Sequence, residues 1–500
     1  MKHRARLGIA LALAATVVPA GLFGADELAP LKARILDVLK ETGVASISVA
    51  VARDGRIVWE EAFGWADRER MIRATPNTMY SLASISKPVT ATGLMVLAER
   101  KLVDIDKPVD DYLGGVKLTP SEKGGRPATV RNVLNHTAGL PLHYQFFYAD
   151  EPDKRPPMEE TIRRYGFLAW PPGEVYLYSN LGYGIIDDLI SRLSRRDYVD
   201  FMRTEVFLPL DMTRTSVGIG PGLADFAAQR YDGDQKPIPF YEFDHPGASA
   251  VYSSAHDLVR FGMFHLKDHL AEQRAIMKDG TIEAMQDEAA STAPEKNYAI
   301  GWGVEKNENG YRTVSHNGGM PGVSTELKLV PSENIAVCVL ANGSHDRIYS
   351  LSEDILAVLL PKYGEVLKAR KKPEERKPVK FVPPAELLGT WSGRLRTYEG
   401  DTPLTVVFEA DGDIHIKPAN GLETLLNPLP NGVSVDKRIL VAGVTPAQIP
   451  TTDAAKHSHN AWIALRLEAG RLTGFAAAMN GRWSALASYV ELKKEGAKGS

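Results

Sequence analysis

Cysteine is almost absent from this chain. Cys338, inside the apolar run 335–340, is the single cysteine among 500 residues, which excludes a disulfide within the chain and any zinc or iron–sulfur site that needs several thiolates. An excess of positive charge is missing as well, because 59 lysine and arginine residues oppose 62 aspartate and glutamate residues, for a formal net charge of -3. We therefore expect no nucleic-acid partner.

Several common catalytic signatures are also missing. The chain contains no Gly-x-Ser-x-Gly, which argues against an α/β-hydrolase, and it contains neither His-Glu-x-x-His nor a glycine-rich phosphate loop. Two histidine pairs, His265 with His269 and His457 with His459, have no third ligand close by, so polar surface is favoured over a metal site. We expect no metal and no cofactor.

Long apolar runs are rare, and the first of them marks the N-terminus. Basic residues at 2–6 precede an apolar run over 7–18, and small residues follow at 18–20. This pattern predicts a signal peptide over residues 1–20 and a secreted or periplasmic protein, with an uncleaved N-terminal anchor as the alternative. No later run approaches the length of a bilayer span, so no integral membrane segment is expected after cleavage.

Strand and helix patterns follow in an order that indicates an α+β fold. Apolar runs at 45–52 and 56–64 flank Asp54-Gly55, a pair that suits a two-residue hairpin turn. Helical spacing predicts a helix over 84–102, and residues 105–295 read as helices joined by long loops. Closing strands are expected at 298–304, 311–315, 325–330 and 335–340, and a final amphipathic helix at 349–363. We predict, over residues 26–365, an antiparallel sheet flanked by helices, with an inserted helical region.

A charged segment precedes a second pattern of strands. Residues 368–380 contain Lys, Arg, Glu and Pro and almost no apolar side chain, which predicts a linker over 366–385. Short strands separated by turn signals then predict a C-terminal antiparallel β-barrel or sandwich over 386–495. Its opening, Gly389-Thr390-Trp391, is reminiscent of lipocalin-like barrels. Because small barrels are usually filled by their own side chains, a filled interior is favoured over a ligand cavity.

Ser84-Ile85-Ser86-Lys87 places a hydroxyl and an amine three residues apart. On a helix these two side chains share a face, and a lysine whose pKa is lowered by burial can act as the base that activates a serine. Proline is tolerated in the first helical turn but not beyond it, so Pro88 places Ser84 at the helix N-terminus. Peptide dipoles there would stabilise a developing oxyanion. A helix start without catalytic function is the alternative.

Two further motifs follow Ser84 in a set order. Tyr178-Ser179-Asn180 precedes a helical pattern, and His316-Asn317-Gly318, followed by Gly319, comes after a strand pattern. In this order and spacing the three motifs resemble those of the serine β-lactamase and penicillin-binding-protein-like family, in the branch of class C β-lactamases, DD-peptidases, D-aminopeptidases and related esterases. The resemblance covers residues 35–362. It implies a helix-flanked antiparallel sheet with the active site in the cleft beside the helical middle.

The resemblance also implies a role for each motif residue. Ser84 would be the acylated nucleophile, Lys87 its partner, and Tyr178 a second group in proton transfer. Whether Lys87 or Tyr178 takes the serine proton stays open, because strongly coupled groups titrate as a set. The backbone N–H groups of Ser84 and Gly319 would form the oxyanion hole. Substrate contacts would come from Asn180, which could instead bind the Lys87 ammonium, and from His316, Asn317, Gly318 and Gly319.

One motif departs from the pattern of the family. Class C β-lactamases usually carry Lys-Thr-Gly where this chain has His316-Asn317-Gly318. Because the unperturbed pKa of histidine is about 6.5, we expect His316 to gain charge as the pH falls from 8 to 6, and to hold a substrate carboxylate less well than lysine does. Efficient β-lactam hydrolysis is therefore not expected.

Together these features predict a secreted serine hydrolase that forms an acyl-enzyme on Ser84. Its small-molecule, peptide or ester substrates would be D-amino-acid peptides, small esters or, weakly, β-lactams. The alternative is a non-catalytic binding or assembly protein on the same fold, which the charged linker and the added barrel would suit.

Overall fold

A computed structural model describes residues 25–287, 297–370, 381–418, 421–434 and 440–496. The predicted signal peptide, residues 1–20, and the central part of the predicted linker, residues 371–380, lie outside the described residues. Within the described part, no helix is both long and apolar enough to cross a membrane.

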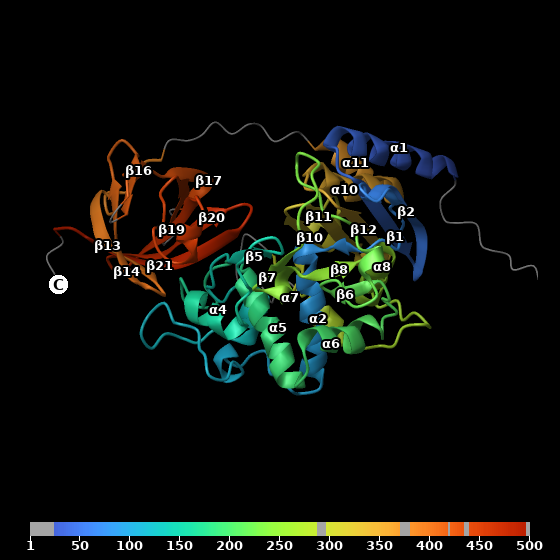
Figure 1. Cartoon of the computed structure of the whole chain (residues 1–500), viewed down its shortest axis with the longest axis horizontal. Helices are drawn as coiled ribbons and strands as arrows, with labels where there is room; N and C mark the ends of the chain where they lie inside the picture. Colours follow the sequence, from blue (N-terminus) through green and yellow to red (C-terminus); the bar gives the residue numbers. More distant parts are fainter. Residues whose placement is uncertain (1–24, 288–296, 371–380, 419–420, 435–439, 497–500) are drawn as a thin grey trace, which may run out of the picture.

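A seven-stranded antiparallel sheet joins the beginning and the end of the first domain (Figure 1). At the β1–β2 turn, Asp54 and Gly55 have φ values of 50° and 72°, which a type I′ hairpin turn requires. β12 pairs with β1, so the predicted union of the opening hairpin with the closing strands is confirmed. The strand order is β3 (Ile72–Arg73), β2 (Arg56–Asp67), β1 (Ser46–Arg53), β12 (Ile335–Ala341), β11 (Val323–Val330), β10 (Tyr311–Met320) and β9 (Gly303–Glu308).

Helices cover both faces of this sheet. On one face, Val49 and Val337 pack in a cluster with residues of α1 (Ala25–Thr42), α10 (Arg347–Leu359) and α11 (Pro361–Ala369). On the other face, Ala50 and Cys338 pack in a cluster with residues of α8 (Ala255–His265). Because successive strand residues point to opposite faces, β1 and β12 are apolar at consecutive positions. We expected the fold to open with strands, but α1 precedes them.

The predicted helical insertion lies between β3 and β9, in the lower middle of Figure 1. α2 (Ser86–Glu99) and α5 (Asn180–Ser194) pack together there. A small antiparallel sheet, in the order β4 (Tyr80–Ser81), β8 (Val251–Ser253) and β6 (Thr215–Val217), lies beside them. The remaining helices of this region are α3 (Val130–Leu134), α4 (Met158–Tyr165), α6 (Tyr198–Met202), α7 (Pro246–Ser249) and α9 (Asp279–Met285).

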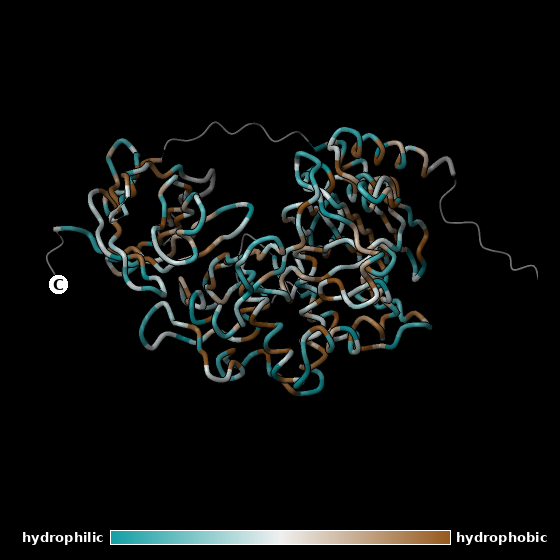
Figure 2. Tube along the Cα trace, viewed as in Figure 1, coloured by the Kyte–Doolittle hydropathy of each residue, from teal (hydrophilic) through white to brown (hydrophobic). Residues whose placement is uncertain are grey.

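The C-terminal strands form a nearly closed antiparallel barrel, drawn in orange to red in Figure 1. Trp391 is buried and its indole N–H donates to the carbonyl of Leu387 at 2.7 Å. Inside the barrel, a cavity of only about 20 Å³ lies among mostly apolar side chains. Figure 2 shows hydrophobic segments in the strands of both domains. The strand order is β16 (Thr424–Leu425), β15 (Ile414–Pro418), β14 (Gly400–Phe408), β13 (Gly389–Thr397), β21 (Ser484–Lys494), β20 (Arg471–Asn480), β19 (Asn460–Glu468), β18 (Leu440–Thr445) and β17 (Asn427–Ser434).

The barrel is joined to the first domain by strand pairing as well as by the chain itself. β5 (Tyr144–Tyr148) pairs with β21 through Tyr144 and Gln145, and with β7 (Tyr241–Phe243) through its last three residues. The Arg466 guanidinium, buried in the barrel, pairs with Glu174 of the first domain at 2.9 Å. Nothing in the sequence pattern predicted this shared sheet.

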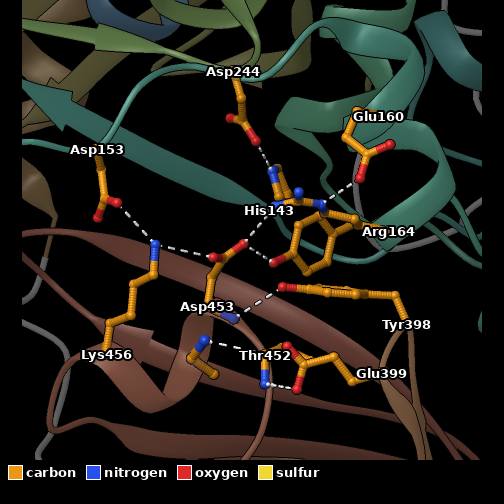
Figure 3. Close-up of polar contacts among 12 residues, drawn as sticks. His143, Asp153, Glu160, Arg164, Asp244, Tyr398, Glu399, Thr452, Asp453 and Lys456 are labelled. Carbon is orange, nitrogen blue, oxygen red and sulfur yellow. Dashed lines mark hydrogen bonds and ion pairs between the residues drawn. The ribbon is translucent and has the colours of Figure 1, made fainter.

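A polar network lies at the same junction (Figure 3). Asp453, at the start of a short helical turn after β18, accepts hydrogen bonds from Arg164 and from the Tyr165 hydroxyl, both at 3.0 Å. The Lys456 amine pairs with Asp453 at 3.2 Å and with Asp153 at 3.0 Å. Burial acts to raise the pKa of the Asp453 carboxyl, but hydrogen bonds from Tyr165 and Lys456 outweigh it and hold the pKa below its usual value.

Candidate active site

Ser84 lies in a tight 3-10 turn, Ala83–Ile85, directly before α2. Ala83 has a φ of 47°, a left-handed conformation that is unfavourable for residues other than glycine. The turn is held on both sides, because the Leu82 N–H donates to the Val251 carbonyl at 2.8 Å and the Leu82 carbonyl accepts from the Thr325 hydroxyl at 2.8 Å. The Ser84 side chain is consequently presented at the start of α2.

Lys87, one helical turn after Ser84, is fully buried. Its Nζ donates to Ser84 Oγ at 3.0 Å and to the Ala248 carbonyl of α7 at 3.2 Å. Among the described residues, no carboxylate forms an ion pair with this amine. Burial lowers the pKa of Lys87 well below its ordinary value. Burial thus favours the neutral form of this amine, which lies within hydrogen-bond distance of Ser84.

Tyr178 contacts the same pair of residues. Its side chain hydrogen-bonds Ser84, and its ring centroid lies 4.7 Å from Lys87 Nζ. Burial raises the pKa of Tyr178, while the hydrogen bond to Ser84 opposes that shift. The Tyr178 phenol therefore stays protonated at pH values at which the Lys87 amine loses its extra proton.

Asn180 is the first residue of α5, which the Ser179 side chain caps by accepting the N–H of Gly182 at 3.3 Å. The Asn180 side chain is buried, and its Oδ1 has no hydrogen-bond partner among the described residues. Lys87 donates to Ala248 in place of this oxygen. Because an unpartnered buried carbonyl is costly, Oδ1 is available to a substrate N–H.

His316 departs from our expectation. It is buried on β10, with Nδ1 2.7 Å from the Asn317 carbonyl and Nε2 2.9 Å from the Tyr298 hydroxyl. A carbonyl only accepts, so Nδ1 carries the proton and Tyr298 donates to Nε2. Burial and the nearby Lys87 lower the pKa of His316 to about 3. The expected gain of charge between pH 8 and 6 is therefore wrong, since burial outweighs the tendency of imidazole to protonate.

The glycines after His316 allow β10 to approach the turn of Ser84. A Cβ atom at Gly318 would overlap the Leu82 carbonyl and the Thr325 hydroxyl, so no other residue fits there. Gly319 and Asn317 are exposed on the same strand. β10 therefore runs directly beside the turn that carries Ser84, and the oxyanion hole of Ser84 and Gly319 stays a prediction.

An aromatic cluster around Lys87 was not predicted. His136 lies between the rings of Tyr178 and Tyr298, at centroid distances of 4.4 and 4.7 Å. Its Nδ1 accepts the backbone N–H of Ser179 at 3.2 Å, so it supports the loop that carries Tyr178. Burial, with a contribution from Lys87, lowers the pKa of His136. These residues are far apart in the chain, and no spacing rule relates them.

One buried group of side chains could offer ligand atoms to a metal ion. His143, Asp244 and His245 bring three such atoms within 4.8 Å of one another. Each imidazole, however, lies 2.5 Å from a different oxygen of Asp244, and Figure 3 shows the first of these contacts. The ring nitrogens that face Asp244 therefore act as N–H donors, and a metal would have to displace both protons.

The histidine pair in the helical region is not arranged as a pair. His265 ends α8 and is buried, with Nε2 3.0 Å from the Thr92 hydroxyl, and burial lowers the pKa of His265 to about 3. His269 lies beyond the helix, is exposed and pairs with Asp279 at 3.1 Å. The two rings therefore do not share one helix face.

Comparisons with known proteins identify a family for this chain. A model of the beta-lactamase family matches residues 31–358. Penicillin-binding protein 4* of Bacillus subtilis (strain 168) is 28% identical over 342 residues, which cover 63% of this chain and 72% of that protein. Unguisins hydrolase ungD' of Aspergillus campestris (strain IBT 28561) is 28% identical over 349 residues, which cover 65% of this chain and 64% of that protein.

A solved structure shares the fold over nearly the whole chain. The crystal structure of SurE with D-Leu superposes with a TM-score of 0.59 at 19% identity and covers 93% of this chain and 100% of that chain. At this identity the likeness shows the fold alone. The family model, by contrast, spans about two thirds of the residues, including both sheet-forming ends and the helical insertion. The chain therefore belongs to the beta-lactamase family, as a hydrolase of the serine type.

Proposed function

We propose that Ser84 is the nucleophile of an acyl-enzyme reaction and that Lys87 is the base that activates it. The observation that carries this proposal is the position of the buried Lys87 amine, 3.0 Å from Ser84 Oγ and without a carboxylate partner among the described residues. A lysine in such a site is a competent base because its neutral form predominates at lower pH than in water.

The reaction then proceeds in two steps on the same serine. Ser84 Oγ loses its proton to Lys87 Nζ and bonds to the carbonyl carbon of the substrate, whose oxygen becomes negative and accepts from the N–H groups of Ser84 and Gly319. The C–N or C–O bond to the leaving group breaks as that group receives a proton. Water, deprotonated by the same base, releases the acyl group and restores Ser84.

Tyr178 suits proton delivery better than proton abstraction. Its hydroxyl hydrogen-bonds Ser84 and stays protonated because burial raises its pKa. It can pass a proton from the Lys87 ammonium to the leaving amine or alcohol. Asn180 Oδ1, which lacks a partner among the described residues, would accept an N–H of a peptide substrate.

We infer peptides with a D-amino acid at the cleaved bond, or small esters, as the substrate class. Two relatives support it: the solved SurE structure contains D-Leu, and another relative is named a hydrolase of unguisins. The neutral His316 and the exposed Asn317 supply no cation for a substrate carboxylate. β-Lactams, which carry that carboxylate, would be poor substrates. The N-terminal sequence supports a secreted or periplasmic location.

Labelling with a fluorophosphonate probe tests the nucleophile. The wild-type protein should be labelled at Ser84, and Ser84→Ala should not be labelled. Ser86→Ala is the matched control, because Ser86 lies two residues away and only accepts the Val251 N–H at 3.0 Å. Labelling that persists in Ser84→Ala, or that never forms in the wild type, would show the assignment to be wrong.

Paired substrates then test the substrate class. A D-amino-acid p-nitroanilide, its L-enantiomer, a p-nitrophenyl ester and a chromogenic cephalosporin should be compared in one buffer. We expect turnover of the D-anilide or the ester at least about tenfold above the cephalosporin, because a lost charged contact costs on the order of 1.5 to 3 kcal/mol. Preference for the cephalosporin, or for the L-anilide over both the D-anilide and the ester, would contradict the proposal.

A further inference from the structure

A large cavity is lined by residues at both ends of α7, Pro246 and Ala250. Its volume is about 690 Å³, within the range of small-molecule sites. Its walls come from α5, α6, the end of β6, β7 and β8, elements that are close together in Figure 1. Neither Ser84 nor Lys87 lines it, so it is distinct from the candidate active site.

A buried carboxylate that forms no ion pair among the described residues lines this cavity. Asp187 of α5 is 7% exposed and lines the cavity. One of its oxygens accepts the Gly247 N–H at 2.6 Å, and the part of the chain that the structure describes provides no second hydrogen bond and no ion pair. Burial raises the pKa of Asp187 well above its usual value, and the hydrogen bond from Gly247 and the positive charge of Arg155 offset only part of that shift.

The walls and the mouth favour a positively charged organic molecule. Three buried aromatic side chains line the inner part, and aromatic faces attract cations. The mouth carries three exposed acids and a single basic side chain, Arg155, so the lining is acidic overall. A second guanidinium, Arg230, lies 3.5 Å from the ring centroid of Tyr241 and 6.0 Å from that of Tyr252, so the rings of Tyr198 and Phe243 are the ones left for a ligand. The aromatic residues are Tyr198, Phe243 and Tyr252, and the acids are Asp197, Asp200 and Glu242.

We propose that this cavity binds a small organic ammonium ion, with the cationic nitrogen on Asp187 and the carbon skeleton against the aromatic walls. The ligand supplies the hydrogen-bond donors and the positive charge that the buried carboxylate lacks. A charge-neutral molecule of the same shape cannot do so.

α7 connects this site to the catalytic lysine. Asp187 holds the N–H of Gly247, and the Thr90 hydroxyl of α2 donates to the Gly247 carbonyl at 2.7 Å. The next residue, Ala248, accepts the hydrogen bond of Lys87 Nζ. A cation that fixes Asp187 in its ionised form strengthens its bond to Gly247 and so fixes the carbonyl that positions Lys87.

Calorimetric titration of the full chain with phenethylammonium tests the site in the wild type. Its neutral analogue phenethyl alcohol and its anionic analogue 3-phenylpropionate serve as ligand controls. The ammonium should bind at least about tenfold more tightly than either, the ratio of one charge-assisted hydrogen bond. Binding should persist after Ser84 has been blocked with fluorophosphonate. Equal affinity for the three probes, no binding of the ammonium at millimolar concentration, or loss of binding on blocking Ser84 would overturn the proposal.

Two variants locate the bound nitrogen. Asp187→Asn keeps the size of the side chain and an oxygen for Gly247, and it should weaken ammonium binding about tenfold or more. Asp188→Asn, the next residue on α5, changes a carboxylate that pairs with Arg192 outside the cavity, and it should leave the affinity unchanged. Unchanged affinity in Asp187→Asn, or equal losses in both variants, would overturn the assignment of Asp187. If Asp187→Asn does not fold, the comparison of probes in the wild type decides.

Discussion

The neutrality of His316 leads to a specific expectation for pH dependence. An unperturbed imidazole, with a pKa of about 6.5, would fall from about 75% cationic at pH 6 to about 3% at pH 8. If that cation held a substrate carboxylate, the KM of a carboxylate-bearing substrate would rise up to about 25-fold over this range, and the KM of its methyl ester would not.

The structure indicates a different outcome. With its pKa lowered to about 3, His316 is only about 0.1% cationic even at pH 6. Its two ring nitrogens are engaged by the Asn317 carbonyl and the Tyr298 hydroxyl in a way that suits the neutral form. The ratio of KM values for the acid and its ester should therefore stay constant from pH 6 to 8.

The assay is KM against pH for the matched acid and ester, in the wild type and in two variants. His316→Gln can keep both hydrogen bonds, since its amide donates to Asn317 and accepts from Tyr298, and it should keep the constant ratio. His345→Gln controls for an exposed imidazole that lines the same surface hollow as Gly319. A ratio that rises several-fold with pH in the wild type and in His345→Gln, but not in His316→Gln, would refute the reasoning.

Three further predictions concern stability and packing. Lys87→Met should remove a pH dependence of stability. Because burial lowers the folded-state pKa of Lys87 below 10.5, the unfolded wild type binds one more proton than the folded wild type between that lowered pKa and pH 10.5. The free energy of unfolding of the wild type, measured by urea denaturation, should therefore rise relative to the variant by up to about 1.4 kcal/mol per pH unit and level off above pH 10.5. Gly318→Ala should abolish fluorophosphonate labelling, because its Cβ would push β10 away from the turn of Ser84, whereas Gly280→Ala, with open space around it, should not. Asp453→Asn should lower the free energy of unfolding by about 2 kcal/mol, because it weakens charged hydrogen bonds across the junction. The control is Asp153→Asn, which removes an exposed ion pair with Lys456 and should lower the free energy of unfolding by less than about 1 kcal/mol.

Periodicity predicted most of the first domain. The hairpin, the last three closing strands and the helix after Ser84 appear where apolar spacing and turn residues indicated them, but the strand expected at 298–304 is wrong, because β9 occupies Gly303–Glu308. α1 was missed although Leu31, Ile35 and Val38 recur at helical spacing and are buried. The junction between barrel and first domain could not be predicted, because the pairing of β5 with β21 joins segments more than 330 residues apart that carry no mutual signal.

The candidate site was inferred from motif order rather than from geometry, and the roles of its residues stay predictions. Ser84, Lys87 and Tyr178 meet in the structure as the resemblance implied. The state of His316 could not be predicted, because the sequence gives the identity of a side chain but not its burial, and burial here outweighs every neighbour that favours the cation. His136 and Tyr298 were missed for the same reason, since only the fold brings them to Lys87.

Strand pairing also connects the C-terminal barrel to the Lys87 amine. β5 pairs through its first two residues with β21 of the barrel and through its last three with β7. β7 leads within three residues to α7, whose Ala248 carbonyl accepts the hydrogen bond of Lys87. A neutral buried amine is a good base only if its hydrogen-bond partners are fixed, because a freed amine would turn away from Ser84 or admit water and regain its proton. Through β5 and β7 the barrel is therefore linked to the short helix whose carbonyl holds Lys87, the base that we propose.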